Sequence, residues 1–358
     1  MNVTEPLIKG KWRIFRNIEL AELRKDYILE KFVVLPPDSY KVKNDTKQCP
    51  YCPGNENMTL PSVLSLVVKE GMLQRLSDNE ENIIENWDVR VFPNSNPVVT
   101  SVNENIYRDK PLYSEPAYGY HYIVVATPDH QENLPKLSIE KWSNVLLVLQ
   151  NYLSHLYTKK SVTYVSIFVN SGFQSGSDIE HAHFHLMTFS TIPPIIESEA
   201  EASNRYLNEN GNCPACNIIS TETGGPRQIL DTESYIAISP WASTYPYEFW
   251  IYPKRHTTSF SKISQKEFRD LGLILRSTLG GMDRVLQKPS FNLIFHLSPE
   301  KKNSRQIHWH IEVYPQIHNW SGLERGFGVY VNHVSPEKSA EVLGSAARKE
   351  FGDVIGIK

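Results

Sequence analysis

An internal repeat constrains the fold of this chain more than any other feature of its sequence. Each half carries a Cys-x2-Cys pair, an apolar segment that ends at a histidine, a helical segment, a β-rich run, a polar loop and a strand of alternating histidines. The interval from His130 to His181 is 51 residues, and that from His256 to His308 is 52. Such self-similarity indicates a duplicated structural unit.

The two copies differ by one insertion. The first Cys-x2-Cys pair ends 78 residues before its histidine, whereas the second ends 40 residues before its own. The polar stretch KEGMLQRLSDNEENIIENWDVR is the candidate insertion. We therefore expect residues 1–200 to form an N-terminal half and residues 201–358 to form a C-terminal half.

Local signals predict helices at matching places in the two halves. Ser264 and Glu267 form a capping-box pair at the start of a segment with apolar residues at helical spacing. Ser335 is a suitable N-cap, and Pro336 follows at the first helical position. The predicted helices cover residues 138–157, 264–286 and 335–351.

The histidine segments alternate as strands do. In EHAHFH the three histidines at 181, 183 and 185 share one strand face, and apolar residues occupy the other face. In HWHIE the same face carries His308, His310 and Glu312. A lone histidine on a strand is usually structural. Three on one face require partners, so a metal ion or an anionic ligand is expected there.

The four cysteines form two pairs, CPYC and CPAC. The first 20 residues contain no signal-peptide pattern, and no apolar run reaches the length of about 18 residues that spans a bilayer. We therefore expect a cytoplasmic protein without membrane contact, in which such pairs indicate metal ligands before disulfides. A net charge of −3 with no basic stripe gives no indication of nucleic-acid binding.

Several segments, in this order, resemble the galactose-1-phosphate uridylyltransferase family, a branch of the histidine-triad superfamily. They are ELRKD, CPYCPGNE, NWDVRVFPNSNP, TPDH, VNSG with GSDIEHAH, PWASTYPYEFWIYPKRH, HWHIEVYP and GFGVYVNHVSPE. The resemblance runs nearly end to end. It implies an α+β fold, a duplicated histidine-triad-like unit in which each half is an antiparallel sheet with helices packed on it, and a homodimer.

The family pattern also implies the metal ligands. Cys49, Cys52, His130 and His181 become a zinc site, and two thiolates with two imidazoles and no open position are typical of structural zinc. By the repeat, a second zinc site consists of Cys213, Cys216, His256 and His308. Some family members instead use a glutamate with three histidines, which here would be His296, His308 and His310.

His183 corresponds to the nucleophile of the family. A neutral imidazole attacks the α-phosphorus of a nucleotide, and the resulting phosphoramidate passes the nucleotidyl group to a second phosphate. Asn170 and Ser177 are candidate contacts for the phosphate oxygens, although plain turn chemistry explains both equally well. Glu324 and Asn332 fall where the family contacts the sugar phosphate, across the dimer in one interpretation, or they are ordinary loop residues.

The chain departs from the family pattern at three places. His185 replaces a glutamine that hydrogen-bonds the nucleotidyl intermediate, and an imidazole in this position could help to activate water. DSYKVK replaces phosphate-binding arginines, so Lys41 or Lys43 would have to act as a point charge. Tyr122 or Ile123 stands where the family has an acidic residue before TPDH.

These observations predict a nucleotidyltransferase that moves a nucleoside monophosphate, UMP in the leading case, between a nucleoside-diphosphate sugar and a hexose 1-phosphate. The nearest alternative keeps His183 but uses phosphate or water as acceptor, as a sugar-nucleotide or dinucleoside-polyphosphate phosphorylase or hydrolase. A further alternative is a zinc protein that binds nucleotides without turning them over.

Overall fold

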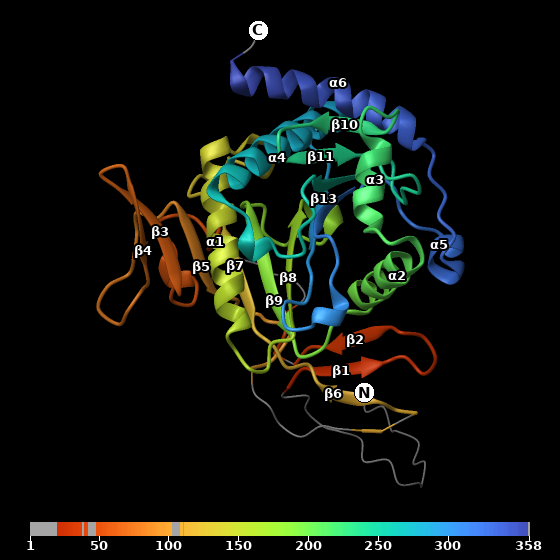
Figure 1. Ribbon diagram of the computed structural model, residues 1–358. Helices are drawn as coiled ribbons and strands as arrows, with labels where there is room; N and C mark the ends of the chain where they lie inside the picture. Colours follow the sequence, from red (N-terminus) through yellow and green to blue (C-terminus); the bar gives the residue numbers. More distant parts are fainter. Residues whose placement is uncertain (1–19, 38, 42–47, 102–107, 110, 357–358) are drawn as a thin grey trace, which may run out of the picture.

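The computed structural model describes residues 20–37, 39–41, 48–101, 108–109 and 111–356. Within these ranges the chain has an α+β fold (Figure 1). Its helices are α1 (Ile139–Tyr157), α2 (Pro194–Asn210), α3 (Pro214–Glu222), α4 (Gln265–Leu286), α5 (Gly322–Phe327) and α6 (Pro336–Ile355). Its strands are β1 (Glu22–Lys25), β2 (Phe32–Leu35), β3 (Leu64–Lys69), β4 (Met72–Leu76), β5 (Val89–Pro93), β6 (Ser114–Pro116), β7 (His121–Val125), β8 (Tyr164–Ser171), β9 (His183–Phe189), β10 (Gln228–Asp231), β11 (Tyr235–Ile238), β12 (Phe249–Pro253), β13 (Phe291–His296) and β14 (His310–Pro315).

One antiparallel sheet of 11 strands runs through both halves in the order β10-β11-β12-β14-β13-β8-β9-β7-β5-β3-β4. Its centre repeats symmetrically, because β12, β14 and β13 on one side correspond to β7, β9 and β8 on the other. The halves meet where β8 pairs with β13, with Asn170 opposite Asn292. The predicted duplication is therefore visible as two antiparallel units joined edge to edge.

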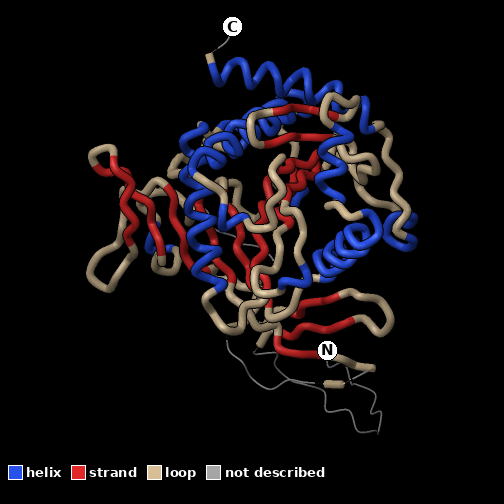
Figure 2. Tube along the Cα trace, in the orientation of Figure 1, coloured by secondary structure: helices blue, strands red, loops and turns tan. Residues whose placement is uncertain are grey.

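The helices form where the sequence predicts them. The hydroxyl of Ser138 accepts a hydrogen bond from the Lys141 amide at the start of α1, and Ser264 with Glu267 completes a capping box on α4. Helices α1 and α4 contribute to one large core cluster together with strands of both halves. Figure 2 shows the helices bordering the strands. A Cβ at Gly281 of α4 would lie 2.7 Å from the backbone nitrogen of Ala347, so the glycine permits α4 and α6 to pack closely.

The alternation on β9 sets the two faces of the sheet. Phe184 and Leu186 are fully buried in the core under the helices. His183 and His185 therefore lie on the opposite face, which carries the site described below. The predicted alternation is confirmed for His183 and His185, whereas His181 lies just before the strand.

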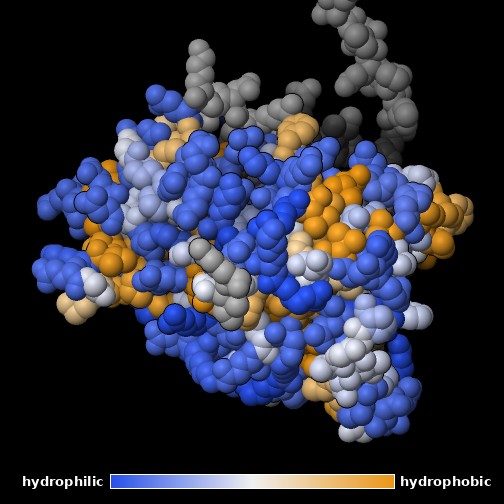
Figure 3. All heavy atoms as spheres, turned by 90° about the horizontal axis from the view of Figure 1, so that it is seen from above, coloured by the Kyte–Doolittle hydropathy of each residue, from blue (hydrophilic) through white to orange (hydrophobic). Residues whose placement is uncertain are grey.

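Two smaller features border this sheet. A three-stranded sheet has the order β2-β1-β6, and β3 with β4 forms a ribbon that stands away from the body (Figure 1). The predicted insertion contributes β4 and the loop after it. Exposed hydrophobic residues on this ribbon include Val68, Met72 and Leu73. In Figure 3 the surface is mainly hydrophilic, and an orange, hydrophobic patch lies on the side of the β3–β4 ribbon.

The division at residue 200 stays a prediction. It falls inside α2, which spans Pro194–Asn210. None of the helices in the described ranges is both long and apolar enough to cross a membrane.

Candidate active site and metal sites

The first Cys-x2-Cys pair meets two histidines just before β9. The Nδ1 atom of His181 lies 3.6 Å from the sulfurs of Cys49 and Cys52, and Nδ1 of His130 lies 3.4 Å from Cys52. All four candidate ligand atoms lie within 4.8 Å of one another. His181 donates from Nε2 to the Thr127 carbonyl at 2.7 Å, which leaves Nδ1 unprotonated and aimed at the thiols. These four residues could hold a zinc ion.

The second pair makes the same arrangement. Cys216 lies 3.4 Å from Nδ1 of His256 and 3.6 Å from Nδ1 of His308, and Cys213 lies 3.9 Å from His308. The Nε2 atom of His308 donates to the Pro253 carbonyl at 2.9 Å. Burial raises the pKa of the Cys216 thiol to about 11, so a bound cation would be needed to hold it as a thiolate. Of the two arrangements left open by the sequence, the one with both cysteines has all four of its ligand atoms within 4.8 Å of one another.

His183 begins β9 and is 5% exposed. Its Nδ1–H donates to the carbonyl of His181 at 2.7 Å, so its Nε2 carries the lone pair. Burial lowers the pKa of His183 to about 4, and the ring is therefore neutral near pH 7. A neutral imidazole with an unoccupied Nε2 is what a nucleophile at phosphorus requires.

His185 lies one step further along the same strand face. Its ring stacks on Phe168 with centroids 4.8 Å apart, and its Nδ1 lies 3.0 Å from Nε2 of His121 on β7. Burial holds the pKa of His185 well below its usual value. His121 was not among the residues predicted from the sequence. It occupies the face of β7 that also carries Ile123, whereas Tyr122 packs into the core.

Asn170 approaches the same place from β8. Phe168 pairs opposite His185, and the same register continued by two residues puts Asn170 opposite His183. The Asn170 Oδ1 atom accepts a hydrogen bond from Asn292 at 2.8 Å, which turns its NH₂ group away from that neighbour.

The other predicted substrate contacts have internal partners. The Ser177 hydroxyl donates to the Ile179 carbonyl at 2.8 Å. The Glu324 carboxylate accepts from the Ser321 amide and from the Val331 amide. The Asn332 amide donates to Ser243 and Tyr245. Each interaction fits a turn or cap, and no contact joins these residues to His183 in the described chain. Their roles in binding stay predictions.

The structure gives little support for Lys41 or Lys43 as a replacement for the family's phosphate-binding arginines. Lys41 lies on an exposed segment, where its backbone amide donates to Asn96 at 3.0 Å. Lys43 lies outside the described residues.

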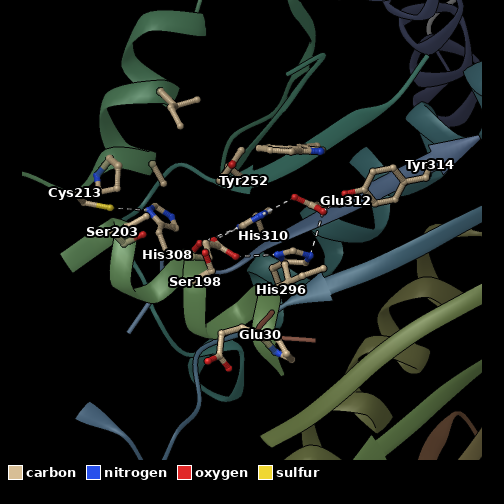
Figure 4. Close-up of a pocket in the computed structure, with 18 residues that line it drawn as sticks. Glu30, Ser198, Ser203, Cys213, Tyr252, His296, His308, His310, Glu312 and Tyr314 are labelled. Carbon is tan, nitrogen blue, oxygen red and sulfur yellow. Dashed lines mark hydrogen bonds and ion pairs between the residues drawn. The ribbon is translucent and has the colours of Figure 1, made fainter. Parts of the chain in front are cut away.

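A cavity of about 660 Å³ opens at the corresponding place in the second half. In Figure 4 the side chains of His296, His310 and Glu312 point toward one another. His296 also contacts Glu199 of α2 at 2.9 Å. Although burial opposes it, hydrogen bonds to Glu199 and Glu312 raise the pKa of His296 to about 10. Glu199, His296 and His310 form a third group that could hold a metal.

The sequence did not identify Glu199. It lies in a helix of mixed polar composition, and only the packing of α2 against the sheet brings it to His296. His310 lies where His183 lies in the first half, but its Nε2 is 3.3 Å from Glu312. The second half therefore lacks an unoccupied nucleophile.

Comparison with known proteins agrees with this geometry. A family model described as galactose-1-phosphate uridyl transferase, N-terminal domain, matches residues 77–193. The chain is 28% identical to the ADP-glucose phosphorylase of Arabidopsis thaliana, over 90% of this chain and 92% of that protein. It is 25% identical to the galactose-1-phosphate uridylyltransferase of Thermotoga maritima, over 90% and 98%.

Solved structures support the same fold. A uridylyltransferase structure covers 92% of this chain and 99% of its own, with a TM-score of 0.78 and 24% identity. The Arabidopsis ADP-glucose phosphorylase with bound ADP-glucose covers 90% of this chain and 98% of its own, with a TM-score of 0.72 and 27% identity.

The duplicated sheet, with a histidine strand in each half, is consistent with a protein of the histidine-triad type. More narrowly, residues 77–193 match the N-terminal domain of the galactose-1-phosphate uridyl transferase family, and the chain is similar to a member of that family over 90% of its length. Relatives that share most of its length include both a uridylyltransferase and a phosphorylase.

Proposed function

We propose that this protein transfers a nucleoside monophosphate, UMP in the leading case, between a nucleoside-diphosphate sugar and a hexose 1-phosphate, through a nucleotidyl group on His183. The observation that carries the proposal is the state of the His183 ring. Its Nδ1–H is bound to the His181 carbonyl, and burial keeps the ring neutral. The Nε2 lone pair is thus available for attack.

The transfer proceeds by two displacements. The Nε2 lone pair of His183 forms a bond to the α-phosphorus, and the bond from phosphorus to the β-phosphate oxygen breaks. That oxygen leaves with the electron pair as part of a hexose 1-phosphate. An incoming phosphate oxygen then attacks the same phosphorus, and the N–P electron pair returns to Nε2. The His181 carbonyl stabilises the positive charge that develops on the ring.

The remaining residues of the first half would support this step. Asn170 and His185 flank the position of the phosphorus and would donate hydrogen bonds to its oxygens. A zinc ion on Cys49, Cys52, His130 and His181 would fix the backbone that holds His183. It would act as a structural element rather than as the catalyst. A homodimer, with Glu324 and Asn332 near the partner's site, remains part of the proposal.

A second candidate function differs in base and acceptor. The 28% identity to ADP-glucose phosphorylase over 90% of the chain favours ADP-glucose as donor and inorganic phosphate as acceptor. The chemistry at His183 would be the same, because inorganic phosphate also attacks as an oxyanion.

Intact-protein mass spectrometry after brief mixing with UDP-glucose or ADP-glucose tests both candidates. We expect a mass gain of one nucleotidyl group, mapped to the peptide that contains His183, absent in His183→Ala and retained in His155→Ala, a control on the exposed side of α1. The donor that gives the adduct identifies the base. Discharge by galactose 1-phosphate or by inorganic phosphate then identifies the acceptor.

The alternative outcomes are equally specific. Rapid loss of the adduct to water would favour the hydrolase interpretation. No adduct and no released nucleotide with either donor, after long incubation, would contradict the assignment of His183. The nucleotide-binding zinc protein would then be the better interpretation.

A further inference from the structure

An aromatic ring joins the first Cys-x2-Cys pair to the proposed nucleophile. Tyr51 lies between Cys49 and Cys52 in the sequence, and it is only 8% exposed. Its ring centroid lies 5.1 Å from that of His183, with an angle of 70° between the two ring planes. It lies 6.4 Å from the ring centroid of His181, at an angle of 68°. Both are edge-to-face contacts of the kind that aromatic rings prefer.

The turn that carries the two cysteines holds Tyr51 in place. The Asn55 side chain donates to the Cys49 carbonyl at 2.8 Å, and the Asn55 amide donates to the Cys52 carbonyl at 3.1 Å. The Tyr51 ring also packs on Phe92 of β5, with centroids 5.5 Å apart, within a small buried cluster. The ring therefore keeps its position as long as this turn keeps its shape.

The orientation of the His183 ring matters more than that of an ordinary buried side chain. Its Nδ1–H donates to the His181 carbonyl at 2.7 Å, and a single hydrogen bond tolerates a range of angles. A nucleophile needs its lone pair aligned with the phosphorus, and small misplacements of reacting atoms lower rates steeply. The contact with Tyr51 is a second, independent restraint on the same ring.

The second half places an aromatic ring beside its corresponding histidine in another way. Its Cys-x2-Cys pair encloses Ala215, which packs in one buried cluster with Tyr252 of β12. Tyr252 stacks on His310, with centroids 4.7 Å apart and an angle of 25°. In the first half the strand residue opposite His183 is Val125. The aromatic neighbour of the histidine thus belongs to the cysteine turn in the first half and to the sheet in the second.

We propose that Tyr51 is a positioning residue that holds the His183 ring in the orientation for attack on phosphorus, and that it makes this orientation depend on the first Cys-x2-Cys site. A metal ion on Cys49 and Cys52 would fix the turn, and the turn fixes the ring. The inference deepens the proposed function and rests on it for the identity of the reaction. The packing of Tyr51 on His183 does not depend on that reaction.

Kinetics test whether the contact positions the nucleophile. Tyr51→Ala should lower the maximum rate of adduct formation about tenfold to a hundredfold, the effect of a small misplacement at a reacting atom. Tyr51→Phe keeps the ring and should stay within about threefold of the unaltered protein. Neither variant should change the donor concentration that gives half the maximum rate by more than about twofold, because Tyr51 acts on His183 and not on the donor. Tyr51→Leu, which keeps more of the packed volume, is the second variant if Tyr51→Ala does not fold.

Other kinetic results would contradict the positioning role. A rise in the half-maximal donor concentration at an unchanged maximum rate would mean that Tyr51 contacts the nucleotide instead. An equal loss of rate in Tyr51→Phe and Tyr51→Ala would assign the effect to the hydroxyl group. Tyr252→Ala removes the corresponding contact in the second half and should leave the rate unchanged. A loss of rate there as large as that in Tyr51→Ala would assign the effect to a general loosening of the fold.

Metal content tests the dependence on the cysteine site. Tyr51→Ala should retain as many metal ions per chain as the unaltered protein by elemental analysis, because all the candidate ligands remain. Loss of an ion would attribute the slower rate to the metal site and would overturn the proposal. In a Cys52→Ser background, Tyr51→Ala should slow adduct formation by less than about threefold further. The full loss in that background would mean that Tyr51 acts independently of the cysteine site, and the proposal would be wrong.

The packing itself can be tested without substrate. In the full-length protein labelled with ¹³C-histidine, the ring protons of His183 should carry a ring-current shift from Tyr51, and His183→Gln identifies their signals by their loss. We expect Tyr51→Phe to keep these signals near their positions and Tyr51→Ala to move or broaden them, with the signals of His155 unchanged. His183 signals that stay in place in Tyr51→Ala would refute the contact. If the unaltered protein forms no adduct with any donor, the proposed function fails, and these signals still show whether Tyr51 restrains the ring.

Discussion

Replacing Asn292 by aspartate would reverse the hydrogen bonding that orients the predicted phosphate contact Asn170. Asn292 donates to Asn170 Oδ1 at 2.8 Å and to the Ser175 carbonyl at 3.0 Å. It accepts from Gln316 at 2.8 Å. A carboxylate at position 292 would face two oxygens, so Asn170 would turn its NH₂ group back toward residue 292. Its oxygen would then face the nucleotide phosphate.

The magnitude follows from the loss of one donor. Removal of a single donor from a preorganised oxyanion site lowers rates by about 10²–10³. Because Asn170 is only half-buried, we expect the lower end, about a hundredfold. The hydrogen bond to the Ser175 carbonyl would be lost at a cost of about 1 kcal/mol of stability, which leaves a folded protein that can be assayed.

The assay is the rate of adduct formation by rapid-quench mass spectrometry, with unfolding followed in parallel. Asn151→Asp on α1, where Asn151 donates to a helix carbonyl, is the matched control and should leave the rate unchanged. In an Asn170→Ala background, Asn292→Asp should add little. A loss of less than threefold in Asn292→Asp, or the same large loss in both backgrounds, would refute this role of Asn170.

Three other predictions concern stability and metal binding. Asp78→Asn leaves buried Arg90 without its counter-ion and should cost about 3–5 kcal/mol in urea unfolding. Hydrogen bonds to the Asp78 carboxylate outweigh its burial and lower its pKa in the folded protein. The stability that Asp78 contributes should therefore be fully present above its unfolded pKa of about 3.9 and should disappear as the pH falls through its lower folded pKa. Cys52→Ser and Cys216→Ser should each remove one bound metal per chain by elemental analysis, and only the former should slow adduct formation. Gly172→Ala should cost about 2 kcal/mol in urea unfolding, because φ is 85° and a Cβ would lie 2.3 Å from a serine hydroxyl.

Much of this site is predictable because its geometry is local. Alternation along β9 puts His183 and His185 on one face whatever the rest of the chain does, and His181 directly precedes this strand. The Cys-x2-Cys spacing and its repetition likewise indicate two clusters before any tertiary contact is known. The helix that starts at Ser264 could be predicted for the same reason, since its capping box lies within four residues.

The parts that escaped prediction depend on register between distant strands. His121 stands in an apolar run, and its importance follows only from the pairing that puts β7 beside β9 with Ile123 opposite His185. Asn292 is one of two polar residues on β13, and its position beside Asn170 follows from the pairing of β13 with β8 across the two halves. A one-residue change of register would turn either side chain to the other face.

The two halves differ at the place where the proposed function puts the nucleophile. His183 and His310 each direct Nδ1 at the carbonyl of the histidine two residues earlier, at 2.7 Å and 3.2 Å. The difference lies two residues further along the strand. There the first half has His185, which leaves Nε2 of His183 unobstructed, whereas the second half has Glu312 within 3.3 Å of Nε2 of His310.

A carboxylate in that position would repel the phosphate that the nucleophile must attack, and its hydrogen bond would hold the nitrogen that must become free. Yet the second half also supplies β13, whose Asn292 donates to Oδ1 of Asn170, the proposed phosphate contact of the first half. In the proposed function the second half therefore positions a phosphate contact of the first half.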